Sequence, residues 1–174
     1  MRIVGIDPGA SGALATIHVD LVDGDRVDLC DTPTLKVKSG KSFKNVINVA
    51  ICAAILKTIR PDHVFIEKVW AMPGKSGEGE DRQSMGATSA FNFGMGFGMW
   101  LGILAALNIP YEQVAPSVWK RTMMGSMEKE KDASRARAMQ LYPQTTKDLN
   151  LKKHHGRADA LLIAAFGRKE RYYP

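Results

Sequence analysis

Apolar and polar residues alternate along the first thirty residues in a way that predicts β-strands. Val4 and Ile6 alternate with other residues up to a single carboxylate, Asp7, and such period-two alternation is typical of a buried strand. An apolar run follows from Ala13 to Val19, and a third segment is preceded by an Asp-Gly-Asp turn. The pattern predicts an antiparallel meander of three strands, residues 1–7, 13–19 and 26–31.

The next sixty residues predict a helix followed by a strand that returns to the sheet. Thr32–Lys44 is polar, contains four lysines and shows no period, so we interpret it as a loop. Val46–Ile59 has apolar residues at helical spacing and stops at Arg60-Pro61, which predicts a helix. His63–Val69 is an apolar strand that carries Glu67. A helical crossover makes this strand parallel to the first, which would bring Glu67 beside Asp7.

The second half of the chain is predicted to be mainly helical. Trp70–Gly86 is a long, glycine-rich segment without a pattern, and loops of this length are usually functional or disordered. Ala87–Leu107 is predicted to be a helix with apolar residues on more than one face, which suits both a core helix and contact with a second copy. The remaining predicted elements are the strand Tyr111–Val114 and the helices Ser117–Met124, Lys131–Leu141 and Gly156–Lys169.

Length and composition favour one domain, residues 1–174, with a sizeable core, since 45% of the 174 residues are hydrophobic. No unbroken apolar run reaches the roughly 18 residues that span a bilayer, and the N-terminus lacks a signal-peptide pattern. We therefore expect no membrane association. Cys30 and Cys52 lie in apolar segments without metal-ligand spacing, so we expect reduced thiols and a cytoplasmic protein.

Positive charge is concentrated in the second half of the chain. From Gln113 onward there are 13 Lys and Arg against 6 Asp and Glu, whereas residues 1–112 carry 11 against 12. This asymmetry favours a polyanionic partner such as nucleic acid, with simple solubility as the alternative.

Three acidic residues, Asp7, Glu67 and Asp159, lie in otherwise apolar elements that should converge at one end of the sheet. Buried carboxylates are costly unless they are paired or bind a metal. A hard divalent cation, Mg²⁺ or Mn²⁺, would relieve their repulsion. His155 precedes Asp159 by four residues and can share its helix face. Taken singly, Asp7 also suits a turn, Asp159 a helix N-terminus, and His155 the surface.

The order of strand Asp, strand Glu and late helical Asp resembles the RuvC-type Holliday junction resolvases of the ribonuclease H-like superfamily, especially short phage forms. The matching residues are Ile6-Asp7-Pro8-Gly9 with Gly12, Phe65-Ile66-Glu67, Val114-Ala115-Pro116-Ser117-Val118-Trp119-Lys120, Gly125, Lys131 and His154-His155-Gly156-Arg157-Ala158-Asp159-Ala160-Leu161. The resemblance covers nearly the whole chain. It implies an α/β fold with a five-stranded mixed sheet flanked by helices on both faces. It also implies a homodimer that nicks two opposed strands of a four-way DNA junction, in the cytoplasm of a bacterium or a phage-infected host.

The resemblance also assigns roles to the acids. Asp7, Glu67 and Asp159 become ligands of Mg²⁺, with two ions per site expected and Mn²⁺ able to substitute. The family usually has a fourth acid just before the helical Asp, where this chain has His155 and Gly156. We assign that role to His155, either as a second-metal ligand or as a proton-transfer group. Lys120 stands where the family has a lysine near the scissile phosphate, with a backbone contact as the alternative.

Other residues are candidates for binding branched DNA. In the family an aromatic residue that follows the strand Glu wedges into the junction centre, a role that falls here on Trp70 and Met72, with packing under the loop as the alternative. Several basic residues are expected to contact phosphates, and a solvated helix face is the alternative for them. They are Lys129, Lys131, Arg135, Arg137, Lys152, Lys153 and Arg157.

Three other functions compete with junction resolution. A ribonuclease H-like nuclease could act on flapped or branched DNA without junction selectivity, and a junction-binding protein could lack cleavage. Actin-like nucleotide-binding proteins also use Asp-x-Gly hairpins, but they are much longer and repeat the motif, which occurs here once.

Overall fold

The sheet of this protein has five strands in the order β3-β2-β1-β6-β7. The computed structural model describes residues 1–69, 87–125 and 132–172. The strands of the sheet are β1 (Arg2–Asp7), β2 (Ala13–His18), β3 (Arg26–Asp31), β6 (His63–Glu67) and β7 (Tyr111–Val114). β1, β2 and β3 pair antiparallel, and β6 is parallel to both β1 and β7. The predicted meander and the predicted parallel return strand are therefore confirmed.

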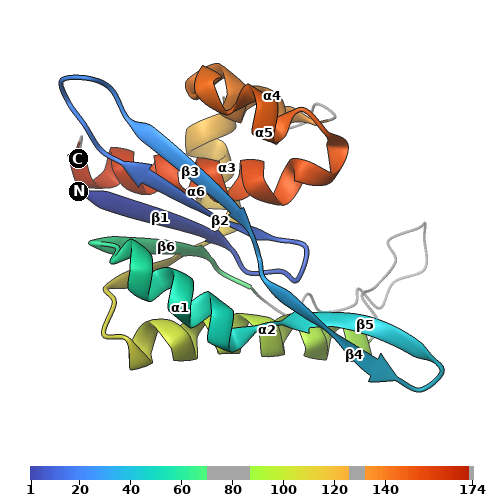
Figure 1. Cartoon of the computed structure of the whole chain (residues 1–174). Coiled ribbons are helices and arrows are strands. Elements are labelled where there is room, and N and C mark those ends of the chain that lie inside the picture. Colours follow the sequence, from blue (N-terminus) through green and yellow to red (C-terminus); the bar gives the residue numbers. More distant parts are fainter. Residues whose placement is uncertain (70–86, 126–131, 173–174) are drawn as a thin grey trace.

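Helices cover both faces of the sheet (Figure 1). α1 (Val49–Ile59) and α2 (Ala87–Ala106) lie on one face, and α6 (His155–Tyr172) crosses the other. The remaining short helices surround α6. They are α3 (Pro116–Met124), α4 (Ala133–Leu141), η2 (Pro143–Thr145), α5 (Thr146–Leu149) and η3 (Lys152–His154). The predicted five-stranded mixed sheet between two helical layers is confirmed.

Each face of the sheet has its own hydrophobic core. Val4 and Ile6 of β1 pack with residues of α1 and α2, including Leu56 and Trp100, which are fully buried. Residues of the opposite parity, such as Ile3, pack against α6. This division follows from the two-residue period of a strand, which sends successive side chains to opposite faces.

The segment predicted to be a loop, Thr32–Lys44, is instead most of a β-hairpin, so that prediction is wrong. β4 (Thr34–Ser39) and β5 (Ser42–Ile47) pair antiparallel, and Gly40 in the turn has a φ of 61°. Nearly all of the hairpin side chains are exposed on both faces, so no buried face marks it in the sequence. α1 begins later than predicted because Val46 and Ile47 belong to β5, and the Asn48 side chain caps the helix by accepting from the backbone N–H of Ile51 at 3.2 Å.

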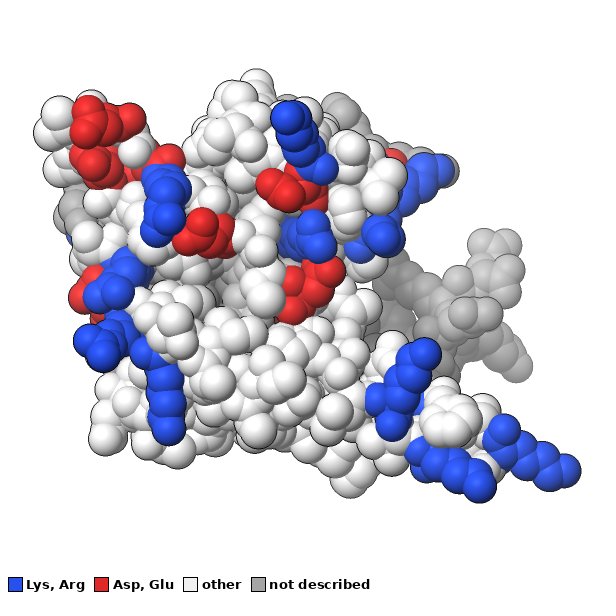
Figure 2. Space-filling model, viewed as in Figure 1, with Lys and Arg blue, Asp and Glu red and all other residues white. Residues whose placement is uncertain are grey.

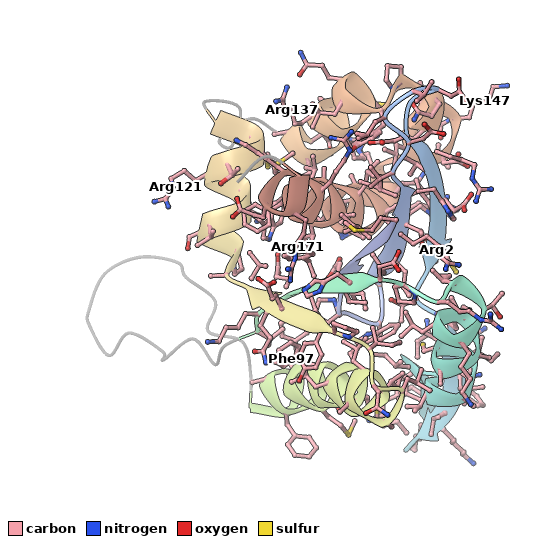
Figure 3. The ribbon with its side chains drawn as sticks, turned by 90° about the vertical axis from the view of Figure 1, so that its left-hand side faces the viewer. Arg2, Phe97, Arg121, Arg137, Lys147 and Arg171 are labelled. Carbon is pink, nitrogen blue, oxygen red and sulfur yellow. The ribbon has the colours of Figure 1, made fainter. Side chains whose placement is uncertain are left out.

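α2 is apolar on more than one side, as predicted. Trp100, Ile103 and Leu104 are buried in the core, whereas Phe91 is 71% exposed. Phe97 points from α2 toward the sheet (Figure 3). One window of this helix, Ser89–Ala106, has a mean hydropathy of 1.3 and is long and apolar enough, by length and composition alone, to cross a membrane. The mean hydropathy of this window is high although glycines and polar residues interrupt its apolar run.

Candidate active site

Asp7 and Glu67 lie side by side at one end of the sheet and on the same face. β1 and β6 pair in parallel with Ile6 opposite Ile66, so the next residue of each strand is a carboxylate. Ile6 and Ile66 are buried in the core on the α1–α2 face. The side chains that follow them therefore point to the other face, which α6 covers. The predicted neighbourhood of Asp7 and Glu67 is confirmed by this register.

Glycines let α6 and the turn after β1 approach Asp7 closely. A Cβ on Gly5 would lie 2.1 Å from the backbone oxygen of Ala160 in α6. A Cβ on Gly156, in the first turn of α6, would lie 2.6 Å from the backbone oxygen of Ser11 and 3.2 Å from Oδ2 of Asp7. Close packing beside the Asp7 carboxylate therefore leaves no room for a side chain at position 156, which sequence reasoning missed. The available signal was its place between His155 and Asp159, where the family that the sequence resembles usually has an acid.

The first turns of α6 bring Asp159 and His155 close to the carboxylates of Asp7 and Glu67. Burial raises the pKa of Asp7 to about 6, with further contributions from the negative charges of Asp159 and Glu67. The Gly9 N–H, which donates to Asp7 Oδ1 at 3.4 Å, and the nearby His155 act in the opposite direction. Four residues from three separate parts of the chain thus share one electrostatic environment.

Burial also raises the pKa of the other two carboxyls. For Asp159 the Ser134 hydroxyl and the charges of Lys120 and His155 partly oppose that rise. Asp159 Oδ1 is buried and has no hydrogen-bond partner in the part of the chain that the structure describes. Half-buried carboxyls with raised pKa values, one with an unpartnered oxygen, form an environment that favours a bound cation.

Trp119 and Lys120 support this acid cluster from α3. The indole N–H of Trp119, which is fully buried, donates to Glu67 Oε2 at 2.8 Å. Burial raises the pKa of Glu67, while the Trp119 hydrogen bond and the Lys120 charge lower it. The Lys120 ammonium lies 5.3 Å from the Trp119 ring centroid and interacts with both Glu67 and Asp159. Sequence reasoning selected Lys120 but missed Trp119, although both belong to the same motif.

A cleft of about 300 Å³ opens beside Asp159, between α3, α4 and the start of α6. Its walls combine acidic and basic side chains, so it has room for an anionic group next to the carboxylates. The lining residues are Lys120, Met124, Asp132, Ala133, Ser134, Arg135, His155 and Asp159. Arg121, the neighbour of Lys120, points away from the body of the protein (Figure 3).

The acids do not form a ready coordination shell. Within residues 1–69, 87–125 and 132–172, no group of three or more His, Cys, Asp or Glu side chains is gathered so as to hold a metal ion. The chemistry of the donors nevertheless fits a hard divalent cation, because carboxylate oxygens predominate and Asp159 Oδ1 is unpartnered. The assignment of Asp7, Glu67, Asp159 and His155 as ligands therefore stays a prediction.

The three arginines predicted to contact phosphates are engaged inside the protein. Arg157 makes a bidentate ion pair with Asp31, at 2.5 and 2.7 Å. Arg135 donates to the Leu149 carbonyl and pairs with Asp132, both at 3.1 Å. Arg137 donates to the Met123 carbonyl at 2.7 Å. As placed, these guanidinium groups stabilise the fold around α4 and α6, although Arg135 also lines the cleft.

The structure describes some of the other predicted DNA contacts and not the rest. Lys152 and Lys153 are exposed next to the start of α6, as a phosphate contact requires. The predicted junction contacts Trp70 and Met72, and the predicted phosphate contacts Lys129 and Lys131, lie outside the described residues.

Comparison with known proteins gives one sequence match and a clear structural match. No family model matches the chain. Over 69 residues, 40% of the chain, it is 44% identical to a protein of Chlamydomonas reinhardtii named "Holliday junction resolvase MOC1, chloroplastic". That match spans only 8% of the length of the Chlamydomonas protein.

The structural match extends over nearly the whole molecule. The Thermus thermophilus RuvC structure has a TM-score of 0.59 at 20% identity, covering 98% of this chain and 97% of that one. T. thermophilus RuvC in complex with Holliday junction substrate has a TM-score of 0.55 at 19% identity, with coverage of 99% and 97%. The chain therefore has the ribonuclease H-like fold of RuvC.

Proposed function

We propose that this protein is a metal-dependent endonuclease that resolves four-way DNA junctions by paired nicks. The observation that carries the proposal is the convergence of Asp7, Glu67 and Asp159, with Lys120 beside them, at one end of a RuvC-like sheet. The local 44% identity to a named junction resolvase supports it. So does the structural likeness to a RuvC solved with Holliday junction substrate.

Asp7, Glu67 and Asp159 would hold the metal. Bound there, two Mg²⁺ ions would supply an activated water and charge stabilisation for the leaving oxygen of the phosphodiester. His155, exposed at the start of α6, serves either as a further ligand or as the group that takes a proton. Because imidazole suits Mn²⁺ better than Mg²⁺, a His155 ligand would shift the metal preference toward Mn²⁺.

The remaining residues of the site position the carboxylates and the phosphate. Trp119 fixes one oxygen of Glu67 through its 2.8 Å hydrogen bond. Lys120 interacts with Glu67 and Asp159, and its ammonium would offset the negative charge that develops on the pentacovalent phosphorus. The cleft beside Asp159 offers Lys120 and Arg135 to the phosphate backbone.

Paired cleavage of a junction requires two copies of this site, and one chain supplies one acid set. We therefore propose a homodimer with two-fold symmetry built on α2. Phe91 and Met95 of this helix are exposed, while the same helix contributes Trp100 to the core. Apolar side chains left exposed beside a core helix are typical of an interface.

β6 ends at Glu67, and Trp70 and Met72 follow it closely in the sequence. These two residues are proposed to contact the junction centre, and Lys129, Lys131, Lys152 and Lys153 are proposed to contact phosphates. Cys30 and Cys52 are free thiols, which agrees with the proposed cytoplasmic location.

One experiment tests the proposed function directly. A labelled four-way junction is incubated with the protein in Mg²⁺, Mn²⁺ or EDTA, and the products are mapped on all four strands. Symmetric nicks in two opposed strands that depend on metal are expected. Equal cutting of a flapped duplex would favour the nuclease without junction selectivity. Tight junction binding without any nicks would favour the non-cleaving alternative.

A further inference from the structure

The hairpin β4–β5 is an arm with an anchored base and an exposed far end. At its base the Asn48 N–H donates to the Pro33 carbonyl at 2.8 Å, and Ile47 is buried in the core. From Leu35 through Asn45 every side chain is exposed. The two strands extend beyond the sheet (Figure 1). Six residues per strand at about 3.3 Å each give the arm a length of roughly 20 Å.

One face of this arm is basic and carries an exposed aromatic ring. Residues 32–48 contain four lysines and no acid. Lys38 lies directly opposite Phe43, and Lys36 lies opposite Asn45, so the register puts these side chains on the same face. Phe43 is 70% exposed. Figure 2 shows blue side chains without red over the far end of the arm.

The arm begins at the end of the sheet that carries the carboxylates. β3 and β1 both run antiparallel to β2, so β3 ends at Asp31 on the same side as Asp7 and Glu67. Immediately after β3, the Thr32 N–H donates to the Gly12 carbonyl at 2.9 Å, in the turn that follows Asp7. The base of the arm therefore lies at the same end of the sheet as the acids.

We propose that β4–β5 binds a duplex arm of the branched substrate beside the cleavage site, an inference that rests on the proposed function. Lys36 and Lys38 contact the phosphates of one strand. Phe43 makes the apolar contact to sugars or base edges in the minor groove. The length of the arm corresponds to about six base pairs at ~3.4 Å each. DNA is the occupant that this face suits, because the face combines positive charge with an aromatic ring and carries no acid.

The first test compares two pairs of lysines. Lys36→Ala/Lys38→Ala removes two charges from the arm, and Lys57→Ala/Lys169→Ala removes two exposed charges near the ends of α1 and α6, away from the carboxylates. Junction affinity is measured over a range of salt. We expect the arm variant to bind about tenfold more weakly at low salt, with a slope of log K against log [salt] smaller by about two, since each phosphate contact contributes about 0.9. The control pair should match wild type.

The second test varies the DNA and the ring. Wild type should bind four-way junctions whose DNA arms are about 12 base pairs long more tightly than junctions whose DNA arms are shorter than about six. The Lys36→Ala/Lys38→Ala variant should bind both junctions equally. Phe43→Ala should weaken binding several-fold with an unchanged salt slope. All variants should cleave at the wild-type rate when junction is saturating, because none touches the acids.

The outcomes separate the two proposals. Wild-type affinity and slope in Lys36→Ala/Lys38→Ala, alongside normal cleavage, would overturn the hairpin inference and leave the nuclease intact. Altered sedimentation with unaltered DNA binding would assign the hairpin to a second copy of the chain instead. If wild type nicks no junction, the proposed function fails, and the same salt titration on linear duplex still shows whether the hairpin binds DNA.

Discussion

The two long helices on opposite faces of the sheet differ in how closely other parts of the chain pack against their small residues. In α6, Ala158, Ala160 and Ala164 are fully buried, and the helix backbone lies so close to β1 that Gly5 has no room for a Cβ. In α2, by contrast, the positions around Gly94, Gly98 and Gly102 are open, with no atom within 4 Å of an added Cβ among the described residues. The first arrangement fixes Asp159 beside Asp7, whereas the second leaves a surface available to another molecule.

This difference separates the region proposed to carry the chemistry from the region proposed to form the dimer. The proposed metal ligand Asp159 needs a fixed position, and close backbone packing of α6 on β1 supplies it. The proposed dimer face of α2 needs only an apolar surface that a second copy can cover. The two faces should therefore respond differently to substitution.

The largest effect is expected from neutralising the acid at the end of β1. Asp7→Asn should lower the rate of junction cleavage by about 10²–10³-fold or more, the range seen when one charge-stabilising group is lost from an active site. Binding to the junction in EDTA should be retained, because the fold and the basic surfaces are unchanged. Asp23→Asn, an exposed acid in the turn between β2 and β3, is the matched control. Wild-type cleavage by Asp7→Asn would remove the acid cluster from the mechanism.

The next effect concerns assembly through α2. Phe91→Glu places a charge on the most exposed aromatic residue of the helix, which is 71% exposed in one chain, so it should produce monomers that remain folded. Sedimentation at micromolar concentration, with and without junction, measures this. Charged substitutions at Met99 or Leu101 test the core side of the same helix. Both are half-buried against the core, so insolubility is the outcome expected there. A wild type that stays monomeric on the junction would exclude paired cutting by a dimer.

The sheet and its acids could be predicted from the sequence because most of its strands show a local hydrophobic pattern. β1, β2 and β6 each have at least one buried face, and the carboxylates end two parallel strands. The hairpin β4–β5 was missed because neither of its faces is buried along most of its length. Its one alternating run, Leu35 and Val37 with Lys36 and Lys38, is only about four residues long, the shortest run that predicts a strand.

The contacts that the sequence did not reveal are those between distant residues. Trp119 donates to Glu67 from 52 positions away, and Arg157 pairs with Asp31 across 126 positions. Nothing in the local sequence distinguishes an arginine that binds phosphate from one that binds a carboxylate of its own chain. Only the placement of β3 next to the start of α6 decides between the two roles.

Glycine substitutions test the contrast between the two helices directly. Gly5→Ala should lower the free energy of unfolding by about 1–3 kcal/mol, since its Cβ would meet the backbone of Ala160 and the packing must shift. Gly98→Ala should raise it by up to about 1 kcal/mol, because alanine favours a helix and open space surrounds the site. Urea denaturation at neutral pH measures both changes. Equal responses at the two sites would contradict the close packing of α6.

The smallest expected effect is a pH dependence that Asp7 adds to the stability of the metal-free protein. Burial raises the pKa of Asp7 to about 6 from 3.8, so between these values the folded protein binds more protons than the unfolded chain. The contribution of Asp7 to the free energy of unfolding, measured as the difference between wild type and Asp7→Asn, should therefore fall as the pH rises from about 4 to about 6, by roughly 1–2 kcal/mol, and then level off. Asp7→Asn lacks this contribution and should be more stable than wild type at pH 7 in EDTA. Mn²⁺ should reverse the order by stabilising only the protein that keeps the carboxylate. If the difference in stability between wild type and Asp7→Asn did not change over this pH range, Asp7 would be ionised without a cation, and the proposed metal would lose its electrostatic basis.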